Sequence, residues 1–172
     1  MTLCLGIDPG LGRLGFAVVK SDGSSYKALE YGVIETRAQT ALPERLSLVY
    51  LKLEEIIRSR NPQLLTVEKL FFGRNRTTAE MIFQARGVVL LLGALNGLRV
   101  AEPTPAQVKT AVCGNGRAQK RQVQLMVQRL FGLPEIPRPD DSADALAVAI
   151  AGIVITEFED RAGGVAVNAP LS

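Results

Sequence analysis

The stretch Leu3-Cys4-Leu5-Gly6-Ile7-Asp8-Pro9-Gly10 runs through apolar residues to an aspartate and then turns. Such a short apolar run is typical of a strand that is buried on both faces. The residues from Gly10 to Gly15 match the G-x-G-x-x-G motif of dinucleotide-binding folds, which requires a helix to follow. Here Phe16-Ala17-Val18-Val19 follows, which is a strand sequence. We therefore predict a tight turn between two strands, whose glycines let another backbone or a phosphate chain approach closely.

Hydrophobic periodicity extends this prediction to the rest of the chain. Strands are predicted over 3–7, 14–19, 26–34, 64–67 and 98–101. Helices are predicted over 43–60, 104–112 and 119–131. Two more helices run from Thr77 or Thr78 to about 97 and from Asp140 or Asp141 to about 158. The first three strands form an antiparallel meander, and the later ones alternate with helices. The sequence predicts an α/β fold with a mixed five-stranded sheet flanked by helices, in one domain over 1–160. We expect the tail at 161–172 to be disordered.

The composition excludes several kinds of chemistry. The chain has 172 residues and no histidine, so it has no Ser-His-Asp triad and no imidazole base. Cys4 and Cys113 are expected to be reduced structural thiols. Residues 1–4 lack the basic start of a signal peptide, and no apolar run reaches the length of a membrane span. We therefore expect a cytoplasmic protein without a membrane partner.

The net charge of +3 is unevenly distributed. Residues 99–138 carry seven basic and two acidic side chains, a net +5, whereas residues 140–161 carry six acidic and one basic, a net −5. One interpretation is an anionic partner held beside a metal-binding cluster. Two solvated faces of opposite sign explain the charges alone equally well.

Four carboxylates are the strongest candidates for chemistry. Asp8 ends the first strand and Glu68 ends the fourth, and parallel neighbouring strands would bring both to one edge of the sheet. Asp141 and Asp144 share a face at the start of the last helix, which can dock at that edge. Converging carboxylates repel one another unless cations are present, and an all-oxygen ligand set favours Mg²⁺ or Mn²⁺. Two such ions suit in-line phosphodiester hydrolysis.

Each acid also has a purely structural interpretation. Asp141 and Asp144 could be a helix cap and a first-turn acid that compensates the helix dipole. Asp8 before Pro-Gly could be a turn residue. Glu68 has no routine structural role at the end of an apolar strand. The set is therefore more specific than any one of its members.

Several motifs together resemble the RuvC-type Holliday junction resolvases. They are Gly6-Ile7-Asp8-Pro9-Gly10, Val67-Glu68 with Phe71 three residues later, Gln84-Ala85-Arg86-Gly87, Pro105-Ala106-Gln107-Val108-Lys109, Gln122-Val123-Gln124 and Asp141-Ser142-Ala143-Asp144-Ala145-Leu146-Ala147. The match runs in order from about residue 2 to 155. Some relatives carry histidine where this chain has Asp141.

The resemblance implies a ribonuclease H-like fold and a homodimer that cuts four-way DNA junctions with paired symmetric nicks, in DNA recombination and repair. It implies Mg²⁺ or Mn²⁺, two ions per site, on Asp8, Glu68, Asp141 and Asp144 as catalytic acids. It also implies branch-migration proteins of the RuvA and RuvB type as partners. Lys109 and Lys120 match lysines near the cleaved phosphate, and Phe71 matches an aromatic residue that stacks on a junction base. Weaker candidates for DNA backbone contacts are Arg74, Arg76, Arg117 and Arg121.

The long helix from Thr77 is a candidate for the dimer contact. It carries Met81, Ala85, Val88, Leu92 and Leu95 on one face, which can pack on the sheet while another face meets a partner. A wholly intramolecular core helix is the alternative. Similarly, Phe71 and Phe72 either reach DNA or anchor their loop, and we expect Phe71 to be exposed and Phe72 buried.

Three other functions compete with junction cleavage. An actin-like or sugar-kinase-like ATPase also grips phosphate at a turn between strands, but it needs two such domains, and 172 residues hold one. A junction-binding protein without nuclease activity gains nothing from carboxylates beside phosphate. A related nuclease of the same fold, acting on other branched DNA or RNA, is the third.

Overall fold

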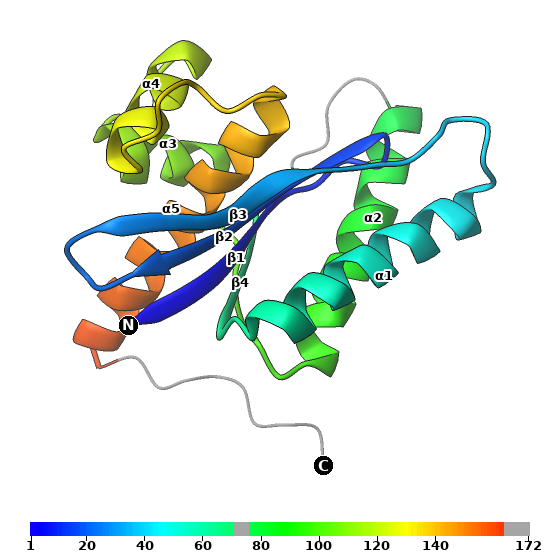
Figure 1. Ribbon diagram of the computed structural model, residues 1–172, viewed down its shortest axis with the longest axis horizontal. Helices are drawn as coiled ribbons and strands as arrows, with labels where there is room; N and C mark the ends of the chain where they lie inside the picture. The colour runs from blue at the N-terminus through cyan, green and yellow to red at the C-terminus, as the bar shows by residue number, and fades with distance from the viewer. Residues whose placement is uncertain (71–75, 164–172) are drawn as a thin grey trace.

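One mixed sheet of five strands organises the computed structural model, which describes residues 1–70 and 76–163 (Figure 1). The strands are β1 (Thr2–Asp8), β2 (Arg13–Ser21), β3 (Tyr26–Glu35), β4 (Leu64–Val67) and β5 (Arg99–Ala101), and they lie in the order β3-β2-β1-β4-β5. β1, β2 and β3 pair antiparallel, while β4 is parallel to β1 and β5 is parallel to β4. The predicted meander and mixed sheet are therefore confirmed.

Helices cover both faces of this sheet. They are α1 (Leu42–Arg60), α2 (Arg76–Leu95), α3 (Pro105–Cys113), α4 (Lys120–Leu130) and α5 (Asp140–Arg161). α1 and α2 lie on one face, and α3, α4 and α5 lie on the other (Figure 1). Successive strand residues point to opposite faces, so Cys4 joins the core under α5 whereas Leu5 and Ile7 join the core under α1 and α2. In the described part of the chain, no helix is long and apolar enough to cross a membrane.

The ends of three helices test the sequence predictions. α1 has Pro43 in its first turn and ends at Asn61 in the left-handed conformation, as its sequence indicates. The predicted start of the second helix at Thr77 or Thr78, where either threonine could cap it, is wrong, because α2 begins at Arg76 and both threonines lie inside it. α5 continues to Arg161, about three residues beyond its predicted end near Phe158. Residues 164–172 of the expected tail lie outside the described residues.

Helix α5 packs unusually close to the sheet because its contact face is made of small residues. Its buried positions include Ala145, Ala149 and Gly152. A Cβ added to Gly152 would lie 1.8 Å from Oγ1 of Thr66 in β4. A Cβ added to Gly15 in β2 would lie 2.1 Å from the carbonyl oxygen of Asp141. The glycine-rich start of β2 therefore does admit another backbone, and that backbone belongs to α5.

We predict that Gly152→Ala destabilises the protein by about 1–3 kcal/mol, since the new methyl group overlaps Thr66 across a rigid helix–strand contact. Urea unfolding measures the change. Gly87→Ala in α2 is the matched control, because a Cβ there meets nothing within 4 Å. It should stabilise the helix by up to about 1 kcal/mol. Equal stability of the two variants would contradict the close packing of α5.

Candidate active site

Two of the predicted carboxylates lie at the same edge of the sheet. Asp8 is the last residue of β1, and Glu68 directly follows β4. The parallel register pairs Ile7 with Val67, and the Glu68 N–H donates a hydrogen bond of 3.3 Å to the carbonyl of Ile7. The two acids therefore leave adjacent strands side by side, as the sequence predicts.

The first turns of α5 bring two more carboxylates to this edge. Asp8 pairs with Gly15 across the β1–β2 ladder, and the backbone of Asp141 lies directly over Gly15. Asp144 follows one turn later. The residue at the N-cap is Pro139, and it makes no side-chain cap, so the interpretation of Asp141 as a helix cap is wrong. Asp141 lies instead in the first turn of α5.

The electrostatics of Asp8 show that the acids share one region. Burial first, and then the nearby charges of Asp144, Glu68 and Asp141, raise the pKa of the Asp8 carboxyl to about 8, against a lowering by Lys120. A carboxyl that remains protonated near neutral pH is one whose negative charge is poorly compensated by the protein. This arrangement is suited to a cation brought from outside.

The pKa values of Glu68 and Asp144 are displaced in the same direction. Burial raises the pKa of Glu68 first, and Asp144 adds to the rise while Lys109 opposes it. Burial likewise raises the pKa of Asp144, although Lys120 lowers it. Lys109 and Lys120, which the family resemblance implies near the reacting phosphate, therefore both lie within electrostatic reach of the acids.

Lys120 forms the most direct contact with the acids. Its Nζ lies 3.1 Å from Oδ2 of Asp140 and 3.2 Å from Oδ2 of Asp144. Partial burial lowers the pKa of Lys120, but these two contacts outweigh it and the pKa is raised overall. The side chain is 56% exposed, so its ammonium group can also reach a ligand in the site.

Three residues near the acids were not singled out from the sequence as site residues. Arg13 Nε lies 3.3 Å from Oδ2 of Asp141. Asp140 binds Lys120, and Arg86 donates a 3.3 Å hydrogen bond from Nε to the carbonyl of Glu68 while pairing with Glu102. Arg13 is 128 positions from its partner, so no local pattern reveals the pair. The doublet Asp140-Asp141 was visible in the sequence, but its spacing alone did not indicate which carboxylate faces Lys120.

The donor set suits a hard divalent cation in its chemistry. All four predicted ligands are carboxylates, and Asp141 Oδ2 is buried without a hydrogen-bond partner among the described residues. Within residues 1–70 and 76–163, however, no three acidic or cysteine side chains are arranged to hold a metal ion as they stand. Lys120 is bonded to Asp144 in this arrangement. The residues fit the ion, and its binding would require their side chains to draw together.

The candidate DNA contacts are only partly placed by the structure. Phe71, Phe72 and Arg74 lie outside the described residues, and Arg76 is the first residue of α2. Arg117 is exposed in the loop before α4, where its N–H donates to Asn115 Oδ1 at 3.0 Å. Arg121 is exposed in the first turn of α4, next to Lys120.

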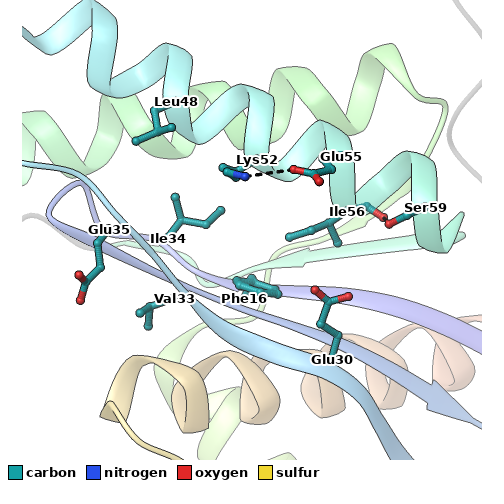
Figure 2. Close-up of a pocket in the computed structure, with 10 residues that line it drawn as sticks. All are labelled: Phe16, Glu30, Val33, Ile34, Glu35, Leu48, Lys52, Glu55, Ile56 and Ser59. Atoms are coloured by element: carbon teal, nitrogen blue, oxygen red, sulfur yellow. Dashed lines mark hydrogen bonds and ion pairs between the residues drawn. The ribbon is translucent and has the colours of Figure 1, made fainter.

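A cavity of about 390 Å³ between β3 and α1 takes no part in this site (Figure 2). Phe16 and Ile34 on the strands and Leu48 on the helix line it, and none of the four acids does. Three of its four charged lining residues form ion pairs, because Lys52 pairs with Glu55 at 3.2 Å and Glu30 pairs with Arg60 at 2.9 Å. The acid cluster is therefore the candidate active site.

Comparison with known proteins shows the family of the chain. The family model for crossover junction endodeoxyribonuclease RuvC matches residues 4–152. The chain belongs to the RuvC family. The ribonuclease H-like fold, the family resemblance and the prediction of a junction-resolving endodeoxyribonuclease are thereby confirmed.

Individual relatives extend over almost the whole chain. The crossover junction endodeoxyribonuclease RuvC of Desulfitobacterium hafniense is 49% identical over 94% of this chain and 98% of its own. The structure of Thermus thermophilus RuvC with a Holliday junction substrate matches with a TM-score of 0.86 and 35% identity, over 95% of this chain and 98% of that one. The yeast mitochondrial Holliday junction resolvase Ydc2 matches with a TM-score of 0.62 at 11% identity, over 93% and 84%, and shares the fold.

The raised pKa of Asp8 predicts a pH-dependent stability in the metal-free protein. Between pH 3.8 and about 8 the folded chain holds a proton that the unfolded chain has released, so stability falls as pH rises through this window. Asp8→Asn removes that penalty. Relative to wild type in EDTA, we expect the variant to gain on the order of a few kcal/mol between pH 5 and pH 8, measured by urea unfolding. Parallel pH profiles for the two proteins would refute the assignment of Asp8 as a buried, strained acid.

Proposed function

We propose that this chain resolves four-way DNA junctions by metal-dependent hydrolysis at Asp8, Glu68, Asp141 and Asp144. The observation that carries the proposal is the burial of Asp8 among three other carboxylates at the sheet edge. Such a set of acids weakens the fold unless a cation neutralises it, and it has no use in a protein that only binds DNA. Membership of the RuvC family supports the junction as the substrate.

The four carboxylates would hold Mg²⁺ or Mn²⁺, with two ions per site. When bound, such ions supply Lewis-acid activation of the attacking water and charge stabilisation at the leaving oxygen. Asp8 and Glu68 are fixed by the two central parallel strands, so they would form the stationary part of the site. Asp144 would exchange its contact with Lys120 for the cation, which frees the ammonium group of Lys120 for the scissile phosphate.

The surrounding basic residues would position the DNA. Lys109 lies within electrostatic reach of Glu68, and Lys120 lies between the acids and solvent. Both would neutralise phosphate charge, which makes binding sensitive to salt. Arg74, Arg76, Arg117 and Arg121 are proposed as weaker backbone contacts, and Phe71 as the residue that stacks on a junction base.

We further propose that residues 1–160 form a single domain, because the strands of one sheet contribute to both cores, one under α5 and the other under α1 and α2. Branch-migration proteins of the RuvA and RuvB type are expected partners on the basis of family membership alone. The cytoplasm is the expected compartment, since a junction nuclease must reach chromosomal DNA.

A homodimer would use the exposed apolar stripe of α2. Ala85 and Leu92 are buried against the sheet as predicted, but Leu95 is 65% exposed and does not belong to the core. Leu91 is 54% exposed and lies one turn before it on the same side of the helix. Two copies joined by this stripe would present two acid sites to a junction that has matching twofold symmetry.

The first experiment tests cleavage. Incubated with labelled four-way junction and Mn²⁺, the wild-type protein should make paired symmetric nicks in the junction and leave plain duplex and an RNA–DNA hybrid intact. Asp8→Asn should lower cleavage by at least about 10³-fold, because it removes a charged ligand from the reacting centre, while junction binding survives.

Asp160→Asn is the control for this experiment. It removes a carboxylate from the far end of α5, where Asp160 pairs with Arg99 at 2.7 Å, so cleavage should be unchanged. Undiminished cutting by Asp8→Asn would refute the catalytic assignment. Junction binding by the wild type without any cutting would indicate a non-cleaving binder, and cutting of the hybrid would indicate a different nuclease.

The second experiment tests the dimer by light scattering during size-exclusion chromatography. Leu91→Lys combined with Leu95→Lys should convert a dimer to a monomer, because two charges would be buried in an apolar contact. Phe158→Lys on α5 is the control, since Phe158 is 71% exposed and its helix covers the opposite face of the sheet. A double variant that stays dimeric would place the interface elsewhere.

A further inference from the structure

A polar groove of about 660 Å³ opens beside the acid cluster. It lies between the start of β2, helix α4 and the connector that leads into α5. Three arginines line it, namely Arg13, Arg121 and Arg138, together with Gln124 and Gln128. We call it the arginine groove. It meets the active site at one end, because Asp140 is part of its wall and Arg13 Nε is 3.3 Å from Asp141 Oδ2.

The walls of this groove are held by specific contacts. Gln128 Nε2 donates to the carbonyls of Leu133 and Pro134 at 3.4 and 3.2 Å, which fixes the connector against α4. Gln124 is only 8% exposed, and its side chain is close enough to Asp140 to help lower the pKa of that carboxyl, after the larger effect of Lys120. The groove is therefore a preformed feature of the fold.

The charge of the groove favours an anion. Arg121 and Arg138 are exposed, and within residues 1–70 and 76–163 neither forms an ion pair. Arg13 is 55% exposed, and its contact with Asp141 is not a hydrogen bond. Two acids, Asp140 and Glu135, lie on the wall against three guanidinium groups, so the lining carries a net charge of +1. Lys120, which contacts Asp140 at 3.1 Å, adds positive charge beside it.

We propose that the arginine groove is a backbone subsite that holds the phosphates of the DNA strand next to the scissile phosphate, through Arg13, Arg121 and Arg138. Arginine and glutamine side chains are common phosphate contacts, and among the described residues none that lines the groove is aromatic. This inference rests on the proposed junction cleavage. It adds Arg13 and Arg138 to the residues that position the DNA, and it gives the strand a path away from the acids.

The test measures junction affinity in EDTA over a range of salt concentrations for Arg13→Gln, Arg138→Gln and the double variant. Each single change should weaken binding severalfold and reduce the slope of log K against log salt by about 0.9, the value for one lost phosphate contact. Arg13→Lys and Arg138→Lys keep the charge and should retain the slope. Arg58→Gln on α1 is the matched control, because it removes one exposed arginine from the opposite side of the sheet.

Neutral methylphosphonate linkages locate the contact. One neutral linkage at a time replaces a phosphate around the scissile position. At the phosphate that Arg138 contacts, the neutral linkage should weaken binding by the wild type. The same linkage should cause no further loss of binding by Arg138→Gln. Salt slopes that stay at the wild-type value in both glutamine variants would overturn the proposal. Inorganic phosphate alone is the second probe: if it binds tightly while the variants keep full junction affinity, the groove is an anion site unrelated to DNA and the proposal also fails.

The outcomes separate this subsite from the proposed function. Wild-type cleavage with unchanged slopes would remove the groove and leave the resolvase intact. Reduced slopes with no wild-type cleavage in Mn²⁺ would keep the groove as a DNA-binding surface and remove the nuclease assignment. Thermal unfolding of each variant checks that the fold is preserved. If a glutamine variant does not fold, the methylphosphonate scan is carried out on the lysine variant of the same residue instead.

Discussion

The close approach of α5 to the sheet is the constraint on which the site depends. Glycine and alanine line the contact, so the helix backbone lies directly over β2 at Gly15 and against Thr66 of β4. Larger residues would push the helix outward and carry Asp141 and Asp144 away from Asp8. Packing density in the core thus sets the separation of carboxylates that belong to distant parts of the chain.

The same geometry creates an electrostatic cost that the fold offsets only in part. Burial and mutual repulsion raise the pKa values of Asp8, Glu68 and Asp144. Lys120 and Lys109 relieve some of this strain, and Arg13 lies against the remaining carboxylate. A site with incomplete compensation is ready for a divalent cation, and its positive surroundings are ready for phosphate. The uncompensated carboxylates lower the stability of the fold at the same place where the proposed metal site needs negative charge.

Much of this arrangement follows from local patterns. The apolar runs that end on Asp8 and Glu68 predicted two strands whose acids meet at one edge, and the registers of β1 and β4 confirm it. The helix start predicted at Thr77 or Thr78 was wrong, and the alternative interpretation of Asp141 as a cap does not hold, because capping residues are common in sequences and tertiary contacts select among them. Leu95 shares a helix face with Leu92 by its spacing, yet Leu92 is buried and Leu95, the last residue of α2, is exposed.

The order of strands and helices, the family and the four candidate carboxylates can be predicted from the sequence alone, because they depend on periodicity and on short motifs. Which charges meet is visible only in the folded structure. The ion pair between Arg13 and Asp141 joins segments that are more than a hundred positions apart, and so does the arginine groove. Lys120 contacts Asp140 and Asp144 over some twenty positions. Such pairings depend on how two backbones pack, and that packing is set by the whole core and not by any local stretch of sequence.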